Sequence, residues 1–297
     1  MRLMSLLAAF GLAMPGVLLA QESPPGAPPP IERPVSEPIT IGTSYTLETH
    51  GAARRINVIV PHGYGESEDS YPILLMLDGG MEQDLFLTFG LSRWNLLWGR
   101  SEQVIFVGVE TVDRQRELLP PTSDTTERER YPSAGESAQF RTWLMGEVLP
   151  MLRANYRSDG RVFLAGESAA GHFVAETWAL HPDLFDGYAA ISPSMQWSGS
   201  ALADQIEASG PRPRPPLFIS LADEGGTTET GIERLVASGG EEICFSDRRS
   251  ELVHANSLHA LLPEALQYLL PTGADWLADY GLVLRCDNRR ETAAQSR

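Results

Sequence analysis

One stretch of the sequence constrains the fold more than any other, residues 161–172, which read Arg-Val-Phe-Leu-Ala-Gly-Glu-Ser-Ala-Ala-Gly-His. The apolar run Val162 to Ala165 is typical of a short buried strand, and a helical pattern follows from Phe173 to Leu180. Ser168 lies between them among small residues, which permit a strained strand-to-helix turn and leave its hydroxyl exposed. The pattern predicts a nucleophile on this turn, with the Ala169 amide at the helix N-terminus facing a developing negative charge.

Four continuous apolar runs have the composition of strands that are buried on both faces. They cover residues 73–77, 103–109, 162–165 and 217–221, and helical stretches alternate with them at 85–97, 138–156, 173–180 and 231–237. This alternation predicts an α/β fold, with a mostly parallel central sheet and helices on both faces. Two segments of alternating polarity, 41–48 and 55–61, are expected to form an antiparallel pair at one sheet edge.

The two ends of the chain differ in composition from its middle. Residues 1–20 combine a short positive start with an apolar core too short to span a bilayer, which predicts a secretory signal peptide. Residues 21–38 are dense in proline and predict an extended linker, followed by a catalytic domain at 39–271 and a tail at 272–297. We therefore expect a periplasmic or secreted protein with no membrane-inserted segment after signal removal.

Charge and cysteine content restrict the partners and cofactors. The net charge of −16 argues against nucleic acid and against anionic membrane surfaces as partners. Cysteine and histidine residues are not clustered at the spacing of zinc ligands, so no metal site is predicted. Cys244 and Cys286 either form one disulfide that ties the tail to the domain or stay unpaired, and both alternatives remain open.

A serine nucleophile needs a histidine base and an acid that orients the histidine. In the chain order serine, acid, histidine, the acid follows a later strand, and the last apolar run is followed directly by Asp223 and Glu224. We take Glu224 first and keep Asp223 as the alternative. Of the two later histidines, His254 precedes a terminal helix predicted at 261–270 and is favoured over His259.

The intermediate of acyl transfer carries an oxyanion that needs two backbone amide donors. Ala169 is expected to supply one of them. The loop after the run 73–77 is expected to supply the second, from Gly79, Gly80 or Met81. A plain turn is the alternative use of these glycines.

Two further side chains are candidates for contact with the substrate. Trp197 is expected to line an acyl or aromatic site, although aromatic residues are more often part of the core. Arg116 is expected to meet a carboxylate or phenolate group, with a surface salt bridge to Glu110 or Glu117 as the alternative.

Several motifs, in order between residues 43 and 270, together resemble the putative-esterase family of α/β hydrolases. That family includes esterase D, enterochelin-type siderophore esterases, feruloyl esterases and mycolyltransferases. The similar segments are a strand ending in Pro-x-Gly-Tyr, the Tyr-Pro…Leu-Asp-Gly segment, the Arg-x-x-Glu-Leu-x-Pro loop, the helix before residue 161 and the Ser-Pro-Ser turn (56–64, 71–80, 114–120, 140–156 and 192–194). The distance from His254 to Leu266 also matches the spacing of the family's histidine.

The resemblance implies an α/β-hydrolase fold and a serine esterase that acts on a small-molecule ester, including siderophore-type esters, without metal or cofactor. An acyltransferase on the same scaffold and a non-catalytic binding protein are the alternatives. Two residues depart from the family's Gly-His-Ser-x-Gly-Gly, because Glu167 and Ala170 replace the histidine and the first glycine. We expect Glu167 to raise the pKa of the base or to disfavour anionic substrates.

Overall fold

The computed structural model of the protein describes residues 36–49, 52–210 and 212–288. The predicted signal peptide and most of the predicted linker lie outside these residues, as does the end of the predicted tail. The chain divides into two units, Met1–Thr40 and Ile41–Arg297. The described part of the first, residues 36–40, has no regular secondary structure. All helices and strands given below belong to the second unit.

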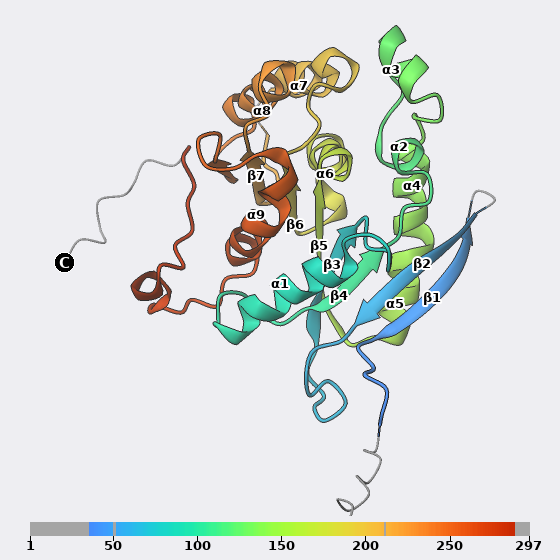
Figure 1. The fold of residues 1–297 in the computed structure, drawn as a ribbon, viewed down its shortest axis with the longest axis vertical. Coiled ribbons are helices and arrows are strands. Elements are labelled where there is room, and N and C mark those ends of the chain that lie inside the picture. The colour runs from blue at the N-terminus through green and yellow to red at the C-terminus, as the bar shows by residue number, and fades with distance from the viewer. Residues whose placement is uncertain (1–35, 50–51, 211, 289–297) are drawn as a thin grey trace, which may run out of the picture. The chain divides into compact units, whose positions relative to one another are not determined.

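The described strands form one eight-stranded sheet in the order β1-β2-β4-β3-β5-β6-β7-β8 (Figure 1). Their bounds are β1 Thr43–Thr49, β2 Ala52–Ile59, β3 Tyr71–Leu77, β4 Ile105–Val109, β5 Ser158–Glu167, β6 Gly187–Ile191, β7 Leu217–Leu221 and β8 Ile243–Asp247. β2 pairs antiparallel with both β1 and β4, and the other pairs are parallel. The predicted parallel sheet with an antiparallel edge pair is confirmed.

Helices cover both faces of the sheet (Figure 1). Their bounds are α1 Leu85–Leu97, α2 Arg114–Leu118, α3 Thr125–Arg130, α4 Ser137–Trp143, α5 Leu149–Asn155, α6 Ala169–Leu180, α7 Trp197–Ser209, α8 Gly226–Ser238 and α9 His254–Leu269, with short turns η1 Leu144–Val148, η2 Pro182–Leu184 and η3 Leu277–Tyr280. α1 and α9 pack on one face, while α4, α5, α6, α7 and α8 pack on the other. Successive side chains of a strand alternate between the two faces, so each strand contributes to both cores.

Several elements differ from the sequence prediction. β6 and β8 were not predicted, because β6 is rich in alanine and glycine and β8 carries polar residues within its five positions. The long helix predicted at 138–156 is divided by the π turn η1, just before Pro150, whose ring cannot join a regular helical ladder. α9 begins at His254 instead of 261, since the Asn256 side chain accepts a hydrogen bond from the Val253 amide at 3.0 Å.

The tail returns to the exposed edge of the sheet. Cys286 forms a disulfide with Cys244 in β8, which resolves the open question of their pairing. Beside it, the Asp287 amide donates to the Phe245 carbonyl at 2.6 Å, and the Asn288 side chain accepts from the Phe245 amide at 2.9 Å. The last strand of the sheet therefore has its outer hydrogen-bonding groups occupied by residues of the same chain.

Removing this disulfide is expected to destabilise the fold. The bonded cysteines are 42 residues apart, and a loop of that length predicts a loss of about 4 kcal/mol in unfolding free energy by chain entropy alone, with 2–4 kcal/mol typical. Urea unfolding of the Cys286→Ser protein against wild type, each with and without reductant, measures the difference. Superimposable unfolding curves would contradict the expectation, and wild type in reductant should approach the variant.

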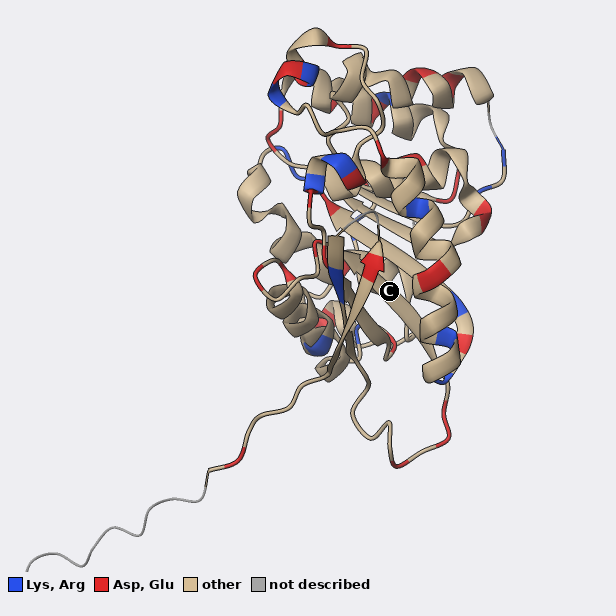
Figure 2. Cartoon of the chain, turned by 90° about the vertical axis from the view of Figure 1, so that its right-hand side faces the viewer, with Lys and Arg blue, Asp and Glu red and all other residues tan. Residues whose placement is uncertain are grey.

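Charged residues lie mostly on helices and loops, with acidic and basic residues interspersed along the chain in the view of Figure 2. In the described part of the chain, no helix combines the length and the apolar character needed to cross a bilayer. Among the described residues, two ion pairs are buried, Arg54–Glu117 and Arg141–Glu176. The first anchors the loop after β4, because Glu117 also accepts hydrogen bonds from the amides of Val112 and Asp113, both at 3.1 Å.

Candidate active site

Ser168 lies between β5 and α6 with φ 60° and ψ −118°, a left-handed conformation that is strained for any residue other than glycine. Neighbouring backbone holds it there. Its amide donates to the Ile191 carbonyl at 3.1 Å, and its carbonyl accepts from the amides of His172 and Ser194 at 2.8 and 3.0 Å. Its hydroxyl lies 3.4 Å from that of Ser194 and is half-buried. The predicted strand–serine–helix turn is thus present, and it presents the hydroxyl at the carboxyl end of a central strand.

Small residues around Ser168 are required by close approaches. A Cβ atom on Gly166 would lie 2.7 Å from the Cβ of Ala170, and one on Gly171 would lie 2.9 Å from the Ile191 carbonyl oxygen. Ala170 itself is fully buried in the core. Alanine at position 170 therefore fits this turn because Gly166 makes room for its methyl group, and the departure from the family pattern leaves the turn intact.

His254 and Glu224, which the sequence predicted as base and acid, are hydrogen-bonded to each other. The Nδ1 atom of His254 lies 2.8 Å from Oε1 of Glu224, whose side chain is 11% exposed. Glu224 lies in the loop after β7, and His254 is the first residue of α9. Since Nδ1–H donates to the carboxylate, Nε2 is left free to accept a proton.

The two alternatives to this pair are solvent-exposed. Asp223 directs its amide to the Leu252 carbonyl at 2.9 Å, which orients the loop and leaves its own side chain exposed. His259 lies one turn and a half further along α9, also exposed, without a carboxylate partner among the described residues. Glu224 is the acid that the geometry supports, because it alone of the two carboxylates is bonded to a histidine.

The environment of His254 raises its pKa above the ordinary value near 6.5. The hydrogen bond that His254 donates to Glu224 is the largest cause, opposed by burial, and the charges of Glu224 and Glu167 raise the pKa further while Arg114 lowers it. A general base must be neutral, so kcat/KM is expected to rise with pH through this pKa. We expect the acid limb of the pH profile to lie above pH 6.5, and to move to lower pH in Glu224→Gln. A limb below pH 6, or one unmoved by the substitution, would contradict this.

The glycines after β3 differ in what their amides can do. The Gly79 amide donates to the Val109 carbonyl at 2.8 Å and extends the β3–β4 ladder, so the expectation of Gly79 as an oxyanion donor is wrong. Glycine is needed there for another reason, because a Cβ would lie 2.3 Å from the Cα of Gly108. The Gly80 amide donates to Oε1 of Gln83 at 3.0 Å, a side-chain partner that a substrate oxygen can replace. Ala169 opens α6, and its amide is among those with no acceptor within the helix.

Arg114 connects the two loops that carry these amides. Its Nε donates to Oδ2 of Asp78 at 2.7 Å, and its Nη2 donates to the Glu167 carbonyl at 3.1 Å. Asp78 follows β3 with φ 55°, and its second carboxylate oxygen accepts from the Thr111 hydroxyl. Asp78 was not predicted to have a role, although an acid at the end of a buried strand, next to two glycines, is a signal for a strained loop.

Neither predicted substrate-binding residue is placed beside Ser168 by any contact in the described residues. Arg116 forms a salt bridge with Glu136 at 2.7 Å, neither of the carboxylates expected for it. Trp197 is 3% exposed, and its indole N–H donates to the Pro120 carbonyl at 2.9 Å. Trp197 is thus a core residue that anchors the loop before α3, because its polar atom is satisfied and its ring is enclosed.

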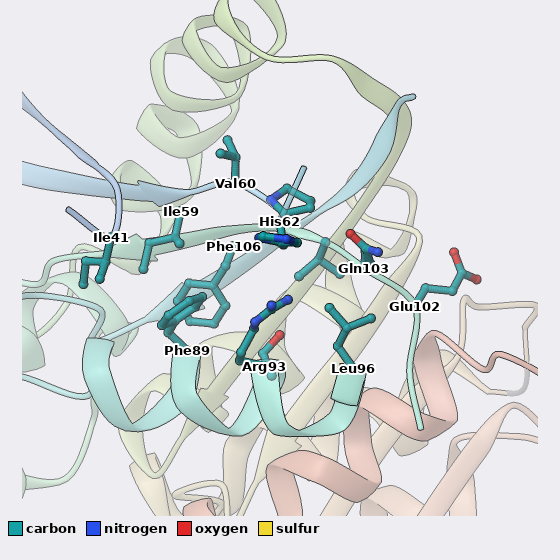
Figure 3. Close-up of a pocket in the computed structure, with 13 residues that line it drawn as sticks. Ile41, Ile59, Val60, His62, Phe89, Arg93, Leu96, Glu102, Gln103 and Phe106 are labelled. Atoms are coloured by element: carbon teal, nitrogen blue, oxygen red, sulfur yellow. The ribbon is translucent and has the colours of Figure 1, made fainter. Parts of the chain in front are cut away.

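A cavity of about 200 Å³ lies near the start of β4, at the end of the parallel strands opposite to Ser168 (Figure 3). It is lined by the C-terminal half of α1, the end of β2 and residues 102–104, which precede β4. Phe106, the second residue of β4, also lines it, so three residues of β4 separate the cavity from the carboxyl end of that strand, roughly 10 Å at 3.3 Å per residue. This cavity is therefore not the site of the predicted chemistry. Among the described residues, no group of histidine, cysteine and acidic side chains is arranged to hold a metal ion.

A mostly parallel sheet, a serine on a strained strand-to-helix turn and a histidine–carboxylate pair beyond later strands define a protein of the α/β-hydrolase class. The model of the family described as Putative esterase matches residues 48–231, so the chain belongs to that family, as its motifs suggested.

A curated relative and two solved structures agree with this class. Ferri-bacillibactin esterase BesA of Bacillus subtilis (strain 168) is 28% identical over 148 residues, 43% of this chain and 49% of BesA, so the chain spans about half of that relative's length. An IroE-like serine hydrolase from Shewanella oneidensis has a TM-score of 0.66 at 20% identity, covering 77% of this chain and 80% of that one. The BES protein from Bacillus cereus has a TM-score of 0.66 at 17% identity, with 81% and 99% covered. The expected α/β-hydrolase fold is confirmed.

Proposed function

We propose that the protein hydrolyses carboxylic esters through Ser168, His254 and Glu224. The observation that carries this proposal is the 2.8 Å contact between His254 Nδ1 and Glu224 Oε1. His254 is the first residue of α9, and Ser257 in the first turn of that helix is hydrogen-bonded to Glu167, the residue before Ser168. This bond links the strand end that carries Ser168 to the helix that begins with His254, which supports the proposal. The orientation of the imidazole by a buried carboxylate is the arrangement that serine hydrolysis requires.

In the proposed reaction, Ser168 Oγ attacks the ester carbonyl while its proton passes to Nε2 of His254. The amides of Ala169 and Gly80 donate to the resulting oxyanion, once the substrate oxygen has replaced Gln83 at Gly80. Collapse expels the alcohol, which takes the proton from His254, and leaves an acyl group on Ser168. Water then attacks this ester with His254 again as base, and releases the acid and the free serine. Every proton in the cycle is taken up and returned by His254.

Siderophore-type esters are the substrate class that we propose. The relative BesA is named for hydrolysis of ferri-bacillibactin, and an enterobactin hydrolase, IroE, is among the similar folds with a TM-score of 0.56. We also propose that the protein is exported to the periplasm or beyond, on the evidence of the signal-like residues 1–20 and of a disulfide that suits an oxidising compartment.

Two substrate series test the proposal. Hydrolysis of p-nitrophenyl acetate and butyrate reports ester cleavage, and chromatography of a catecholate trilactone, metal-free and as its ferric complex, reports the substrate class. We expect turnover of both series. A folded protein that cleaves neither would overturn the esterase proposal, and cleavage of the p-nitrophenyl esters alone would overturn the siderophore part. An added alcohol acceptor that consumes the acyl group faster than water would favour an acyltransferase instead.

A further inference from the structure

Glu167 is a carboxylate placed immediately before the proposed nucleophile. It is the last residue of β5, and its side chain is half-buried. Along β5, Phe163 and Ala165 face the core under α1 and α9, whereas Val162 and Leu164 face the core under α6. By the two-residue alternation of a strand, Glu167 points toward the face that α9 covers.

The contacts of Glu167 lie in the first turn of α9. Its Oε1 accepts a hydrogen bond from the Ser257 hydroxyl at 2.7 Å and from the Leu258 amide at 3.2 Å. The same Ser257 hydroxyl lies 2.9 Å from the carbonyl oxygen of His254. Ser257 is fully buried, so this chain of contacts is shielded from water. A carboxylate near the start of a helix is also favoured by the helix dipole.

Ser168 and His254 belong to elements on different faces of the sheet. Ser168 immediately precedes α6, which packs on one face of the sheet, and His254 is the first residue of α9, which packs on the other face. The two helices are separated by the sheet, so helix–helix packing does not align their N-termini. Glu167 spans this gap, because its backbone is continuous with Ser168 and its side chain is bonded to the turn that begins with His254.

We propose that Glu167 is a positioning residue for the hydrolysis proposed above: its carboxylate ties the first turn of α9, and with it His254, to the strand end that carries Ser168. The inference rests on the proposed function. It also gives a structural role to Glu167, which stands where the family's Gly-His-Ser has histidine. Arg114 completes the arrangement from the other side, since it holds the Glu167 carbonyl.

The charge of Glu167 adds an electrostatic effect to this geometric one. His254 faces Glu224, Glu167 and Arg114, and the first two raise its pKa while the last lowers it. Glu167 in turn lies near Asp84, whose pKa is raised first by burial and then by the charges of Asp78 and Glu167. Removing the negative charge at position 167 therefore lowers the pKa of His254, whereas keeping an acceptor oxygen there preserves the tie to α9.

Three variants separate these effects, with p-nitrophenyl butyrate as substrate and circular dichroism to check the fold. Glu167→Ala removes tie and charge, and we expect kcat to fall about 10- to 100-fold with KM within about twofold, as for a misplaced catalytic group. Glu167→Gln keeps an acceptor oxygen, so we expect most of kcat to return while the acid limb of kcat/KM moves to lower pH. Ser257→Ala should lower kcat without moving that limb. Glu147→Gln, an exposed carboxylate on η1, is the matched control and should change neither.

The outcomes are distinguishable. Wild-type kcat in Glu167→Ala, with an unmoved acid limb in Glu167→Gln, would overturn this inference alone. If Glu167→Ala does not fold, Ser257→Ala decides, because it removes the same tie, and wild-type kcat in that variant rejects the inference. Activity that survives Ser168→Ala would overturn the proposed function and this inference with it.

Discussion

Ser168→Ala is expected to lower kcat/KM for p-nitrophenyl butyrate by about 10⁴- to 10⁶-fold, because loss of a triad member costs a serine hydrolase on that order. The reason is chemical, because alanine cannot form the acyl-enzyme and only the amide donors and the binding surface remain. The fold should survive, since the bonds that hold residue 168 are made by its amide and carbonyl and do not involve the hydroxyl.

Ser194→Ala is the matched control for this variant. Its hydroxyl lies 3.4 Å from that of Ser168, so it shares the same surroundings without the strained turn. We expect its kcat/KM to stay within about tenfold of wild type. A fluorophosphonate should label wild type and Ser194→Ala but not Ser168→Ala. If Ser168→Ala retained more than a hundredth of wild-type activity, or if labelling followed Ser194, the nucleophile would have to be reassigned.

Glu224→Gln is expected to lower kcat by about 10²- to 10⁴-fold, the second-largest effect. Glutamine keeps the shape of the side chain but removes the charge that stabilises the imidazolium, and it can favour the wrong imidazole tautomer. Glu224 is nearly enclosed beside His254, so solvent does not replace the lost charge.

Asp223→Asn tests the same substitution at the adjacent position. Its side chain is exposed and its structural contact is made by the backbone amide, so we expect kcat within about threefold of wild type. Equal losses in both variants would mean that loop geometry, and not the Glu224 carboxylate, is what the first substitution disturbs. A larger loss in Asp223→Asn would reverse the assignment of the acid.

The sheet and the nucleophile turn were predictable because their causes are local. A continuous apolar run such as 73–77 identifies a strand buried on both faces, and small residues around Ser168 identify a turn that larger side chains would prevent. β6 escaped prediction, since Gly-Tyr-Ala-Ala-Ile has little intrinsic preference for a strand and is held in place by its two neighbours.

The details of the site depend on contacts between distant segments, which a single sequence does not show. Asp223 and Glu224 are adjacent and chemically alike, and what distinguishes them is the hydrogen bond between Glu224 and His254, 30 residues later. Gly79 was misassigned because its amide is taken by Val109, 30 residues further on. Trp197 finds its partner in Pro120, 77 residues earlier, and no local pattern indicates that contact.

The tail segment at the edge of β8 has a consequence for association between copies of the chain. An open strand edge is a template onto which another chain can add a strand. Asp287 and Asn288 occupy the Phe245 groups that an incoming strand would use, and Cys286 fixes them there. A tethered segment competes as an intramolecular ligand at an effective concentration on the order of millimolar, above what any intermolecular strand reaches in dilute solution. In copies that fold before the disulfide forms, the segment is not fixed beside β8 and competes less well with an incoming strand. We therefore expect the self-association of such copies to begin at β8.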